Sequence, residues 1–277
     1  VLLPSDCIAM VIVALFASYF VRLWCLGSAD GIIMQQGSTS WDYSTAIVLA
    51  NGFPVIAGYT YGNFPGMNLT GSLDAIVVKY NPDGTQEAIT TIATTAEVWA
   101  STVDDSANIY LVGHTTSDLN GTNAGAGTWT NDVFIAKVDS NLNQVWLIQT
   151  GTTTHDWGYA VALDSSGKVI VGGGSGGTWP DQTLLGRSDA LIMQYDSHGN
   201  RQWVIQFGSA EDDYVYGIAV DTVDSVDDIY ATGGSDGSFE GHNNSGESDL
   251  FLIKVSSTGP KDWSVMSGTS PTWSNDK

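Results

Sequence analysis

The stretch RSDALIMQ (residues 187–194) has three counterparts in the same chain: GSLDAIVVK (71–79), TNDVFIAK (130–137) and ESDLFLIK (247–254). The aspartates of these stretches recur every 57–60 residues, as Asp74, Asp132, Asp189 and Asp249. A short, continuous apolar run of this kind is typical of a buried strand. Four copies in register show that the chain is built from an internal repeat. Repetition of the aspartate favours a structural role for it, such as accepting N–H groups of a loop.

Other positions repeat in step with these aspartates. WLIQTG (146–151), WVIQFG (203–208) and WSVMSG (263–268) match one another, and IIMQQG (32–37) is an earlier copy without the tryptophan. Each repeat holds four short runs rich in Val, Ile, Tyr and Trp, separated by Gly, Asn, Asp and Ser, which are residues of β-turns. Four strands per repeat predict one blade of a β-propeller.

Several of these segments resemble the SBBP-type β-propeller repeat, named for a seven-bladed propeller. The matching elements are DW (156–157), IAVD (218–221), NIYLVGHT (108–115) and DAIVVKY (74–80). The resemblance covers residues 32–277 and implies an all-β propeller, but no particular chemistry. The second repeat departs from the pattern, because TTAEVW (94–99) lacks the Gly and Asp of its neighbours.

The repeat divides residues 30–277 into four-stranded blades near 43–93, 98–150, 157–207 and 214–268. An outer strand at 32–36 precedes them, and a fifth blade begins at 272. Because neither end supplies a whole blade, we expect about four blades in an incomplete ring.

The N-terminal region predicts a hydrophobic helix within residues 1–29. CIAMVIVALFASYFV (7–21) is uncharged, and Arg22 interrupts the apolar stretch. Its length fits a signal peptide, or a signal-anchor that contacts the membrane through residues 7–26 if it is not cleaved. A buried or peripheral helix of the domain is the third alternative. On one helix Cys7 and Cys25 would lie about 27 Å apart, too far for a disulfide.

The composition excludes several classes of protein. The chain has 277 residues, 30 Asp+Glu and 9 Lys+Arg, and a net charge of −21. So few cations exclude a nucleic-acid binder. A hydrophobic content of 43% argues against disorder. The excess of acidic groups suits a solvated extracellular or cell-surface protein.

The candidate ligand-binding residues lie in loops. Asp42, Asp156 and Asp213 recur where the chain enters the first strand of a blade, and the other candidates are His155, Trp129 and Trp179. Loop capping and packing are the alternative roles of these residues. Two G-x-S-x-G matches, at 173–177 and 233–237, lack the following helix of a nucleophile elbow, so we predict no catalytic residue there.

Two further kinds of site are suggested by short patterns. The turn with Asp221, Asp224, Asp227 and Asp228 is a weak Ca²⁺ candidate, although its spacing differs from an EF-hand and a solvated acidic turn explains it as well. We predict no other cofactor. Asn68, Asn120 and Asn243 open N-x-[ST] sequons and are glycosylation candidates, with chance occurrence as the alternative.

We therefore expect a secreted or membrane-tethered propeller that acts as a binding or adhesion scaffold for a protein or glycan ligand. The first alternative is a carbohydrate-active hydrolase or lyase that uses carboxylates of the loop face. The second is a purely structural matrix or surface component.

Overall fold

The computed structural model describes residues 9–11, 21–25, 33–67, 69, 73–119, 129–223 and 226–269. Sixteen of the described strands form four separate sheets, which we call blades 1 to 4. Blade 1 consists of β4 (Asp42–Ala50), β5 (Phe53–Thr60), β6 (Asp74–Tyr80) and β7 (Gln86–Thr94). Blade 2 consists of β8 (Ala96–Val103), β9 (Ile109–Thr115), β10 (Asp132–Val138) and β11 (Gln144–Thr150). Blade 3 consists of β12 (Asp156–Leu163), β13 (Val169–Ser175), β14 (Asp189–Tyr195) and β15 (Arg201–Phe207). Blade 4 consists of β16 (Asp213–Val223), β17 (Val226–Ser235), β18 (Asp249–Ser256) and β19 (Lys261–Ser267).

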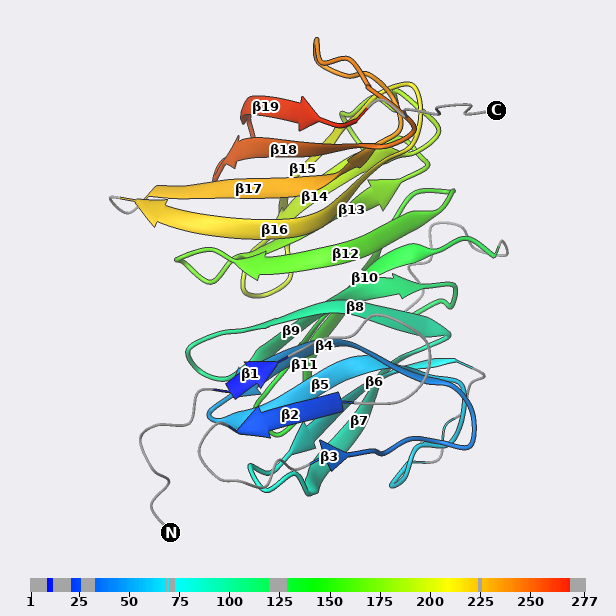
Figure 1. The fold of residues 1–277 in the computed structure, drawn as a ribbon, viewed down its shortest axis with the longest axis vertical. Helices are drawn as coiled ribbons and strands as arrows, with labels where there is room; N and C mark the ends of the chain where they lie inside the picture. Colours follow the sequence, from blue (N-terminus) through cyan, green and yellow to red (C-terminus); the bar gives the residue numbers. More distant parts are fainter. Residues whose placement is uncertain are drawn as a thin grey trace, which may run out of the picture.

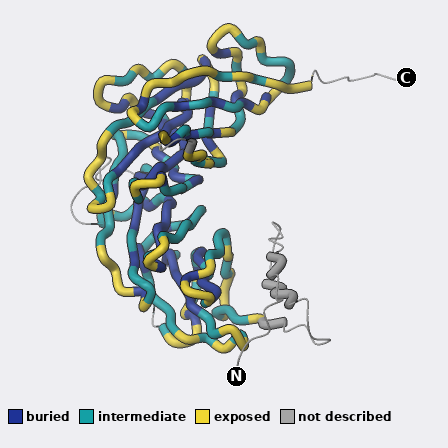
Figure 2. Tube along the Cα trace, turned by 90° about the vertical axis from the view of Figure 1, so that its left-hand side faces the viewer, coloured by how far each residue is buried: buried dark blue, intermediate teal, exposed yellow. Residues whose placement is uncertain are grey.

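The blades are antiparallel meanders, because strands that follow one another in the chain are neighbours in the sheet. Blades 1 to 4 follow one another along an open arc, and blades 1 and 4 lie at its opposite ends (Figures 1 and 2). The first strands β4, β8, β12 and β16 contact one another and lie on the inner side of this arc. The prediction of all-β, four-stranded repeats is confirmed, and the sheets are arranged like the blades of a propeller.

In blades 2 and 3 the third strand is apolar on both faces because a neighbouring blade covers each face. Every residue of β14 is buried. Val133 and Ile135 of β10 belong to the same buried cluster as Leu191 and Met193 of β14. Burying a side chain of this size stabilises the fold by about 1.5–3 kcal/mol. The blades therefore hold together through the apolar layers between them.

Side-chain donors on the third and fourth strands also tie each blade to the next. The indole of Trp146 in blade 2 donates to the carbonyl of Ser197 in blade 3, at 3.1 Å. Trp203 in blade 3 donates in the same way to Ser257 of blade 4, at 3.2 Å. The ammonium of Lys79 in blade 1 donates to the Ser140 carbonyl of blade 2, at 3.0 Å. Each acceptor lies in the turn between the third and fourth strands of the following blade.

The described parts of the N-terminal region are strands, whereas the sequence predicted a helix there. β1 (Ala9–Val11), β2 (Val21–Cys25) and β3 (Ile33–Met34) form a separate antiparallel sheet. The expected outer strand at 32–36 is thus represented by β3, which pairs with β2 and not with a blade. The rest of the apolar segment, and the expected fifth blade from 272, lie outside the described residues. Among the residues that are described, none belongs to a helix with the length and hydropathy needed to cross a bilayer.

Neighbouring residues of β18 provide a test of the apolar layer between blades 3 and 4. Phe251 is fully buried, and its ring contacts those of Phe207 and Phe239 at centroid distances of 5.7 Å. Leu250 points to the opposite face and is 60% exposed. We expect Phe251→Ala to lower the free energy of unfolding by about 3–5 kcal/mol, and Leu250→Ala to change it by no more than about 0.5 kcal/mol. Urea unfolding measures both, and equal losses would contradict this packing.

Candidate functional site

The three aspartates at the starts of first strands are bound to their own loops. One carboxylate oxygen of Asp156 accepts the backbone N–H of Thr152 at 2.6 Å and its hydroxyl at 3.0 Å. Asp213 accepts the same two groups of Ser209, at 2.6 and 3.0 Å. Asp42 repeats the arrangement with Ser38, at 2.6 and 3.1 Å. Asp156 and Asp213 have no exposed surface. These carboxylates thus shape the segments that lead into the first strands, and they lie on three different blades.

Burial changes the acidity of these groups. It raises the pKa of Asp156 to about 6, with a smaller contribution from the negative charge of Asp132, while hydrogen bonds from Ser175 and Thr152 oppose the rise. Burial also raises the pKa of Asp213.

The aspartates at the starts of the third strands, Asp74, Asp132, Asp189 and Asp249, are buried as well. Each lies opposite a Ser or Thr at the end of the second strand. The structural role of these four aspartates stays a prediction.

The loop candidates occupy very different environments. Trp179 is 1% exposed, and its indole donates to Asp156 at 3.2 Å and to Ser175 at 2.9 Å. Trp129 is 87% exposed. The exposed ring of His155 stacks on Trp157, at a centroid distance of 5.5 Å. Trp179 therefore fills the end of a blade, and His155 and Trp129 are the candidates that remain at the surface.

The acidic turn and the sequons are only partly described. Asp227 accepts the hydroxyls of Thr222 and Ser165, and Asp228 pairs with Lys254 at 2.8 Å. Asp221 is exposed, whereas Asp224 lies outside the described residues. Within the described part of the chain, no three ligand-type side chains come together as they would around a metal ion. Asn243 is exposed, and Asn68 and Asn120 lie outside the described residues.

A feature that the sequence analysis missed is a β-bulge in the first strand of every blade. The pairing register shifts between Ser44 and Ala46, Val98 and Ala100, Gly158 and Ala160, and Val215 and Gly217. Such a bulge re-aims the side chain of the extra residue. The extra residues are Thr45, Trp99, Tyr159 and Tyr216. The last three rings form a row across blades 2 to 4, with centroid distances of 5.5 Å from Trp99 to Tyr159 and from Tyr159 to Tyr216.

A second set of rings extends this row toward the starts of the strands. Trp157 and Tyr214 contact each other at 5.6 Å, and Tyr214 also contacts Tyr159 at 6.2 Å. In blade 1, Tyr43 stacks on Tyr59 at 4.9 Å. We call the following residues the aromatic surface: Tyr43, Tyr59, Tyr61, Trp99, Trp157, Tyr159, Tyr214 and Tyr216. Tyr216 is 57% exposed and Tyr61 41%, and the other rings are half-buried.

Glu97 and His114 of blade 2 lie within the aromatic surface. Their side chains approach to 3.6 Å between Oε2 and Nε2, and His114 stacks on Trp99. Burial raises the pKa of Glu97. Burial lowers the pKa of His114 to about 4, and the nearby His155 adds to the effect. Burial raises the pKa of Tyr59, Tyr61 and Tyr159, and the charge of Glu97 adds to the effect.

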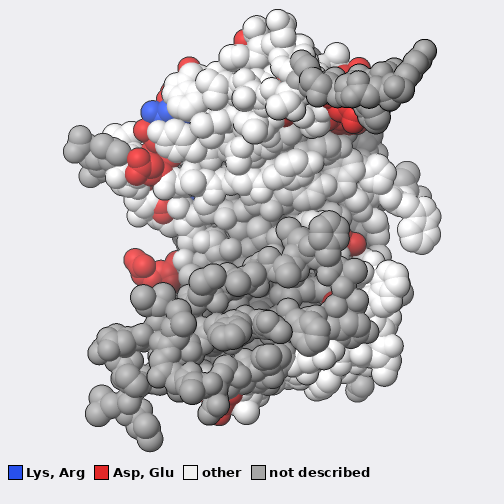
Figure 3. All heavy atoms as spheres, viewed as in Figure 1, with Lys and Arg blue, Asp and Glu red and all other residues white. Residues whose placement is uncertain are grey.

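Over the first strands of blades 3 and 4, the face that Figure 3 leaves in view is largely free of charged side chains, and the acidic groups gather at its edges. A signal for the surface exists in the sequence, because the first strands begin DYST, AEVW, DWGY and DYVY at residues 42, 96, 156 and 213. The aromatic residues mostly take the second and fourth positions of these segments, which indicates that they share one face of the strand. The rings of different strands come together only through the bulges and the contact between blades.

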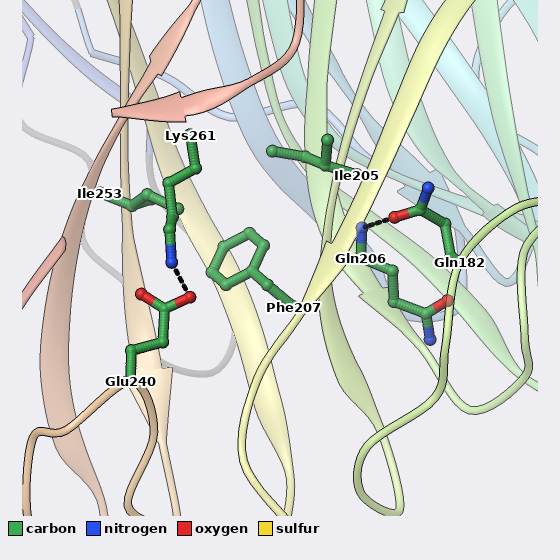
Figure 4. A pocket seen from close by; sticks show the side chains of 7 residues that line it. All are labelled: Gln182, Ile205, Gln206, Phe207, Glu240, Ile253 and Lys261. Atoms are coloured by element: carbon green, nitrogen blue, oxygen red, sulfur yellow. Dashed lines mark hydrogen bonds and ion pairs between the residues drawn. The ribbon is translucent and has the colours of Figure 1, made fainter. Parts of the chain in front are cut away.

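A cavity of about 240 Å³ lies between β15 and blade 4, as Figure 4 shows. Ile205, Phe207 and Ile253 form its apolar wall. Its polar groups pair with one another: Lys261 with Glu240, and the Gln206 N–H with the Gln182 side chain at 3.0 Å. The cavity therefore offers a ligand fewer free groups than the aromatic surface does.

Comparisons with known proteins give distant likenesses only. No family model and no curated protein matches the chain. Among solved structures, it is similar to a protein of unknown function from Bacteroides caccae, with 8% identity, a TM-score of 0.42 and 90% of each chain covered. It is also similar to a xylan β-1,4-xylosidase from Bacillus halodurans C-125, with 10% identity, a TM-score of 0.43, and 91% of this chain and 49% of that one covered. A GH43_1 enzyme from Xanthomonas citri gives 10% identity, a TM-score of 0.36, and coverage of 83% and 87%. Likenesses at this level carry no argument about the site.

The buried Asp156 carboxyl provides a test of the loop network. Its pKa of about 6 in the folded chain exceeds the ordinary 3.8. The folded protein therefore holds this proton more tightly than the unfolded chain, and the resulting stabilisation is complete below pH 3.8 and is lost as the pH rises through 6. Relative to Asp156→Asn, the wild type should lose up to about 3 kcal/mol of unfolding free energy between pH 4 and pH 7.

Asp196 is the matched control, because hydrogen bonds from Asn200 and His198 lower its pKa. Relative to Asp196→Asn, the wild type should lose stability as the pH falls. Urea unfolding at several pH values measures both differences. A pH-independent difference for Asp156→Asn would show that this carboxyl is not held in a desolvated loop.

Proposed function

We propose that the protein is a binding scaffold whose contact surface is the aromatic surface, and that its ligand is an extended, uncharged glycan chain. The observation that carries this proposal is the row of rings from Trp99 through Tyr159 to Tyr216, which crosses three blades without a break. A surface that continues from blade to blade suits a chain-like ligand better than a compact one.

The chemistry of the surface supports a glycan. Tyrosine and tryptophan present a flat apolar face together with a polar group, which matches the C–H face and the hydroxyls of a sugar ring. Glu97 supplies an acceptor for sugar hydroxyls within the row. Burial raises the pKa of Tyr214 and Tyr216, and the negative charges of Asp212 and Asp236 add to the rise. These acids and the net charge of −21 disfavour the binding of anionic chains.

A carbohydrate-active enzyme is the second candidate, and one observation favours it. Burial raises the pKa of Glu97, as a general acid requires. Glycoside hydrolysis, however, uses two carboxyl groups about 5–9 Å apart. The earlier candidates Asp42, Asp156 and Asp213 are each bound to their own loop on separate blades. An enzyme would need a second carboxyl group near Glu97, whereas a binding scaffold needs none. We therefore prefer the scaffold.

The family and the location are proposals of the same kind. The segments shared with SBBP-type repeats support membership of that family, and they support a secreted or membrane-tethered protein at the cell surface. The low content of cations and the exposed sequon at Asn243 agree with an extracellular setting.

Calorimetric titration with hexasaccharides of β-1,4-linked glucose, xylose and N-acetylglucosamine tests the proposed site. At least one should bind, and Trp99→Ala and Tyr159→Ala should each weaken its binding by about tenfold or more, or roughly 1.4 kcal/mol. Trp129→Ala is the control and should leave the affinity unchanged, because this exposed ring lies outside the aromatic surface. Failure of all three sugars to bind, or an equal loss with Trp129→Ala, would contradict the proposal.

The variant Glu97→Gln separates the scaffold from the enzyme. For a scaffold we expect the affinity to stay within about threefold of the wild type, because the amide still offers hydrogen bonds. We also expect the wild type to release no reducing ends from the bound hexasaccharide. Release that Glu97→Gln abolishes would establish the enzyme instead.

A further inference from the structure

We call the face of a blade that is turned toward the next blade in the chain its forward face. In blades 1 to 3 the forward face of the third strand packs on the next blade, and the forward face of blade 4 carries the same kinds of residue. The forward residues there are Ala75 and Val77, Val133 and Ile135, and Ala190 and Ile192, and all are fully buried. The same two positions of β18 hold Leu250, which is 60% exposed, and the partly exposed Leu252. The repeat thus continues onto a face that the described residues leave uncovered.

The fourth strand shows the same change. Val265 of β19 is 47% exposed, whereas its counterparts Ile148 and Ile205 pack partly buried in the layers between blades. A hollow of about 250 Å³ lies beside these residues, bordered by Ile218, Tyr230 and Leu252. An apolar face of this kind is an aggregation hazard unless a partner covers it.

Blade 4 also carries hydrogen-bonding groups that join neighbouring blades elsewhere in the chain, but here they have no partner among the described residues. Trp263 occupies the position of Trp146 and Trp203, whose indoles donate to a turn carbonyl of the next blade. Its ring is 41% exposed, and its indole N–H has no acceptor among the described residues.

A second unused group lies at the start of β18. The carbonyls of Asn131 and Ser188 accept the N–H of the first-strand aspartate of the next blade, at 2.7 and 2.8 Å. Ser248 has their position in blade 4, and within the described part of the chain its carbonyl receives no such bond.

We propose that the forward face of blade 4 is the docking surface for a further blade of the same repeat, joined in tandem to blade 4. The apolar positions continue the pattern of the three interfaces within the described chain. The indole donor and the Ser248 carbonyl continue that of the two interfaces on either side of blade 3. The matching rear face of a second copy is already occupied, because Ile76 and Val78 of blade 1 are 5% and 1% exposed and pack with Phe64. The occupant is therefore another blade and not a second copy of the chain.

A tandem variant tests the proposal. Residues 153–207, which form blade 3, are repeated after Thr269, because Gly268-Thr269 corresponds to Gly151-Thr152. We choose blade 3 because its rear face, with Leu191 and Met193, already packs on Val133 and Ile135. We expect the indole N–H of Trp263, assigned by NMR with Trp263→Phe, to exchange at least tenfold more slowly than in the 277-residue chain. The melting temperature should rise by roughly 5 °C.

Leu250→Asp is the matched control in both chains. In the 277-residue chain it should leave the fold intact, since this side chain is exposed. In the tandem variant it should abolish the protection of Trp263 and the rise in melting temperature. An added blade that stays unfolded on the wild-type face, or protection that survives Leu250→Asp, would overturn the proposal. A dimer of the 277-residue chain that Leu250→Asp dissolves, seen by light scattering, would also overturn it in favour of a second copy.

Discussion

The packing of one blade on the next is the constraint on which the rest of this structure depends. A four-stranded sheet with apolar residues on both faces of its third strand cannot bury them alone, so each blade requires neighbours. Residues such as Phe134, Leu191 and Phe251 have no exposed surface because two blades enclose them. The buried apolar layers between the blades stabilise the described chain. They also fix the order of the blades along the arc.

The same packing determines where the candidate site forms. When third strands stack, the first strands of consecutive blades come into contact on the inner side of the arc (Figure 2). The bulges then direct Trp99, Tyr159 and Tyr216 toward one another, and rings from separate repeats become one surface. The buried aspartates contribute indirectly. Asp156 and Asp213 organise the loops that lead into β12 and β16, and so they position the first rings of these strands.

Much of the fold could be predicted from the repeat alone, because the period and the alternation of apolar runs with turn residues follow directly from the four strands of a blade. The starts of the third strands at Asp74, Asp132, Asp189 and Asp249 are examples. The site was harder to predict. A bulge leaves no mark in a single strand, and the ring positions are filled by different residues in different blades, such as Glu97 where other blades have Tyr43, Trp157 and Tyr214. Trp179 was a candidate ligand-binding residue because it lies in a loop of the sequence. Its side chain is buried, however, since a loop tryptophan can turn inward and fill the end of a blade. The N-terminal apolar run suggested a helix from its hydropathy, but its described parts pair as strands.

Hydroxyl-radical footprinting in the presence and absence of a bound hexasaccharide tests the central claim most directly, because it reports which side chains a ligand covers. The account predicts that the sugar protects Tyr61 and Tyr216, the most exposed rings of the aromatic surface, together with Trp99 and Tyr159. It predicts no change at Trp129 or Trp41, which are 87% and 70% exposed and lie outside that surface. Protection confined to Trp129 or Trp41, with the rings of the first strands unaffected, would contradict the account.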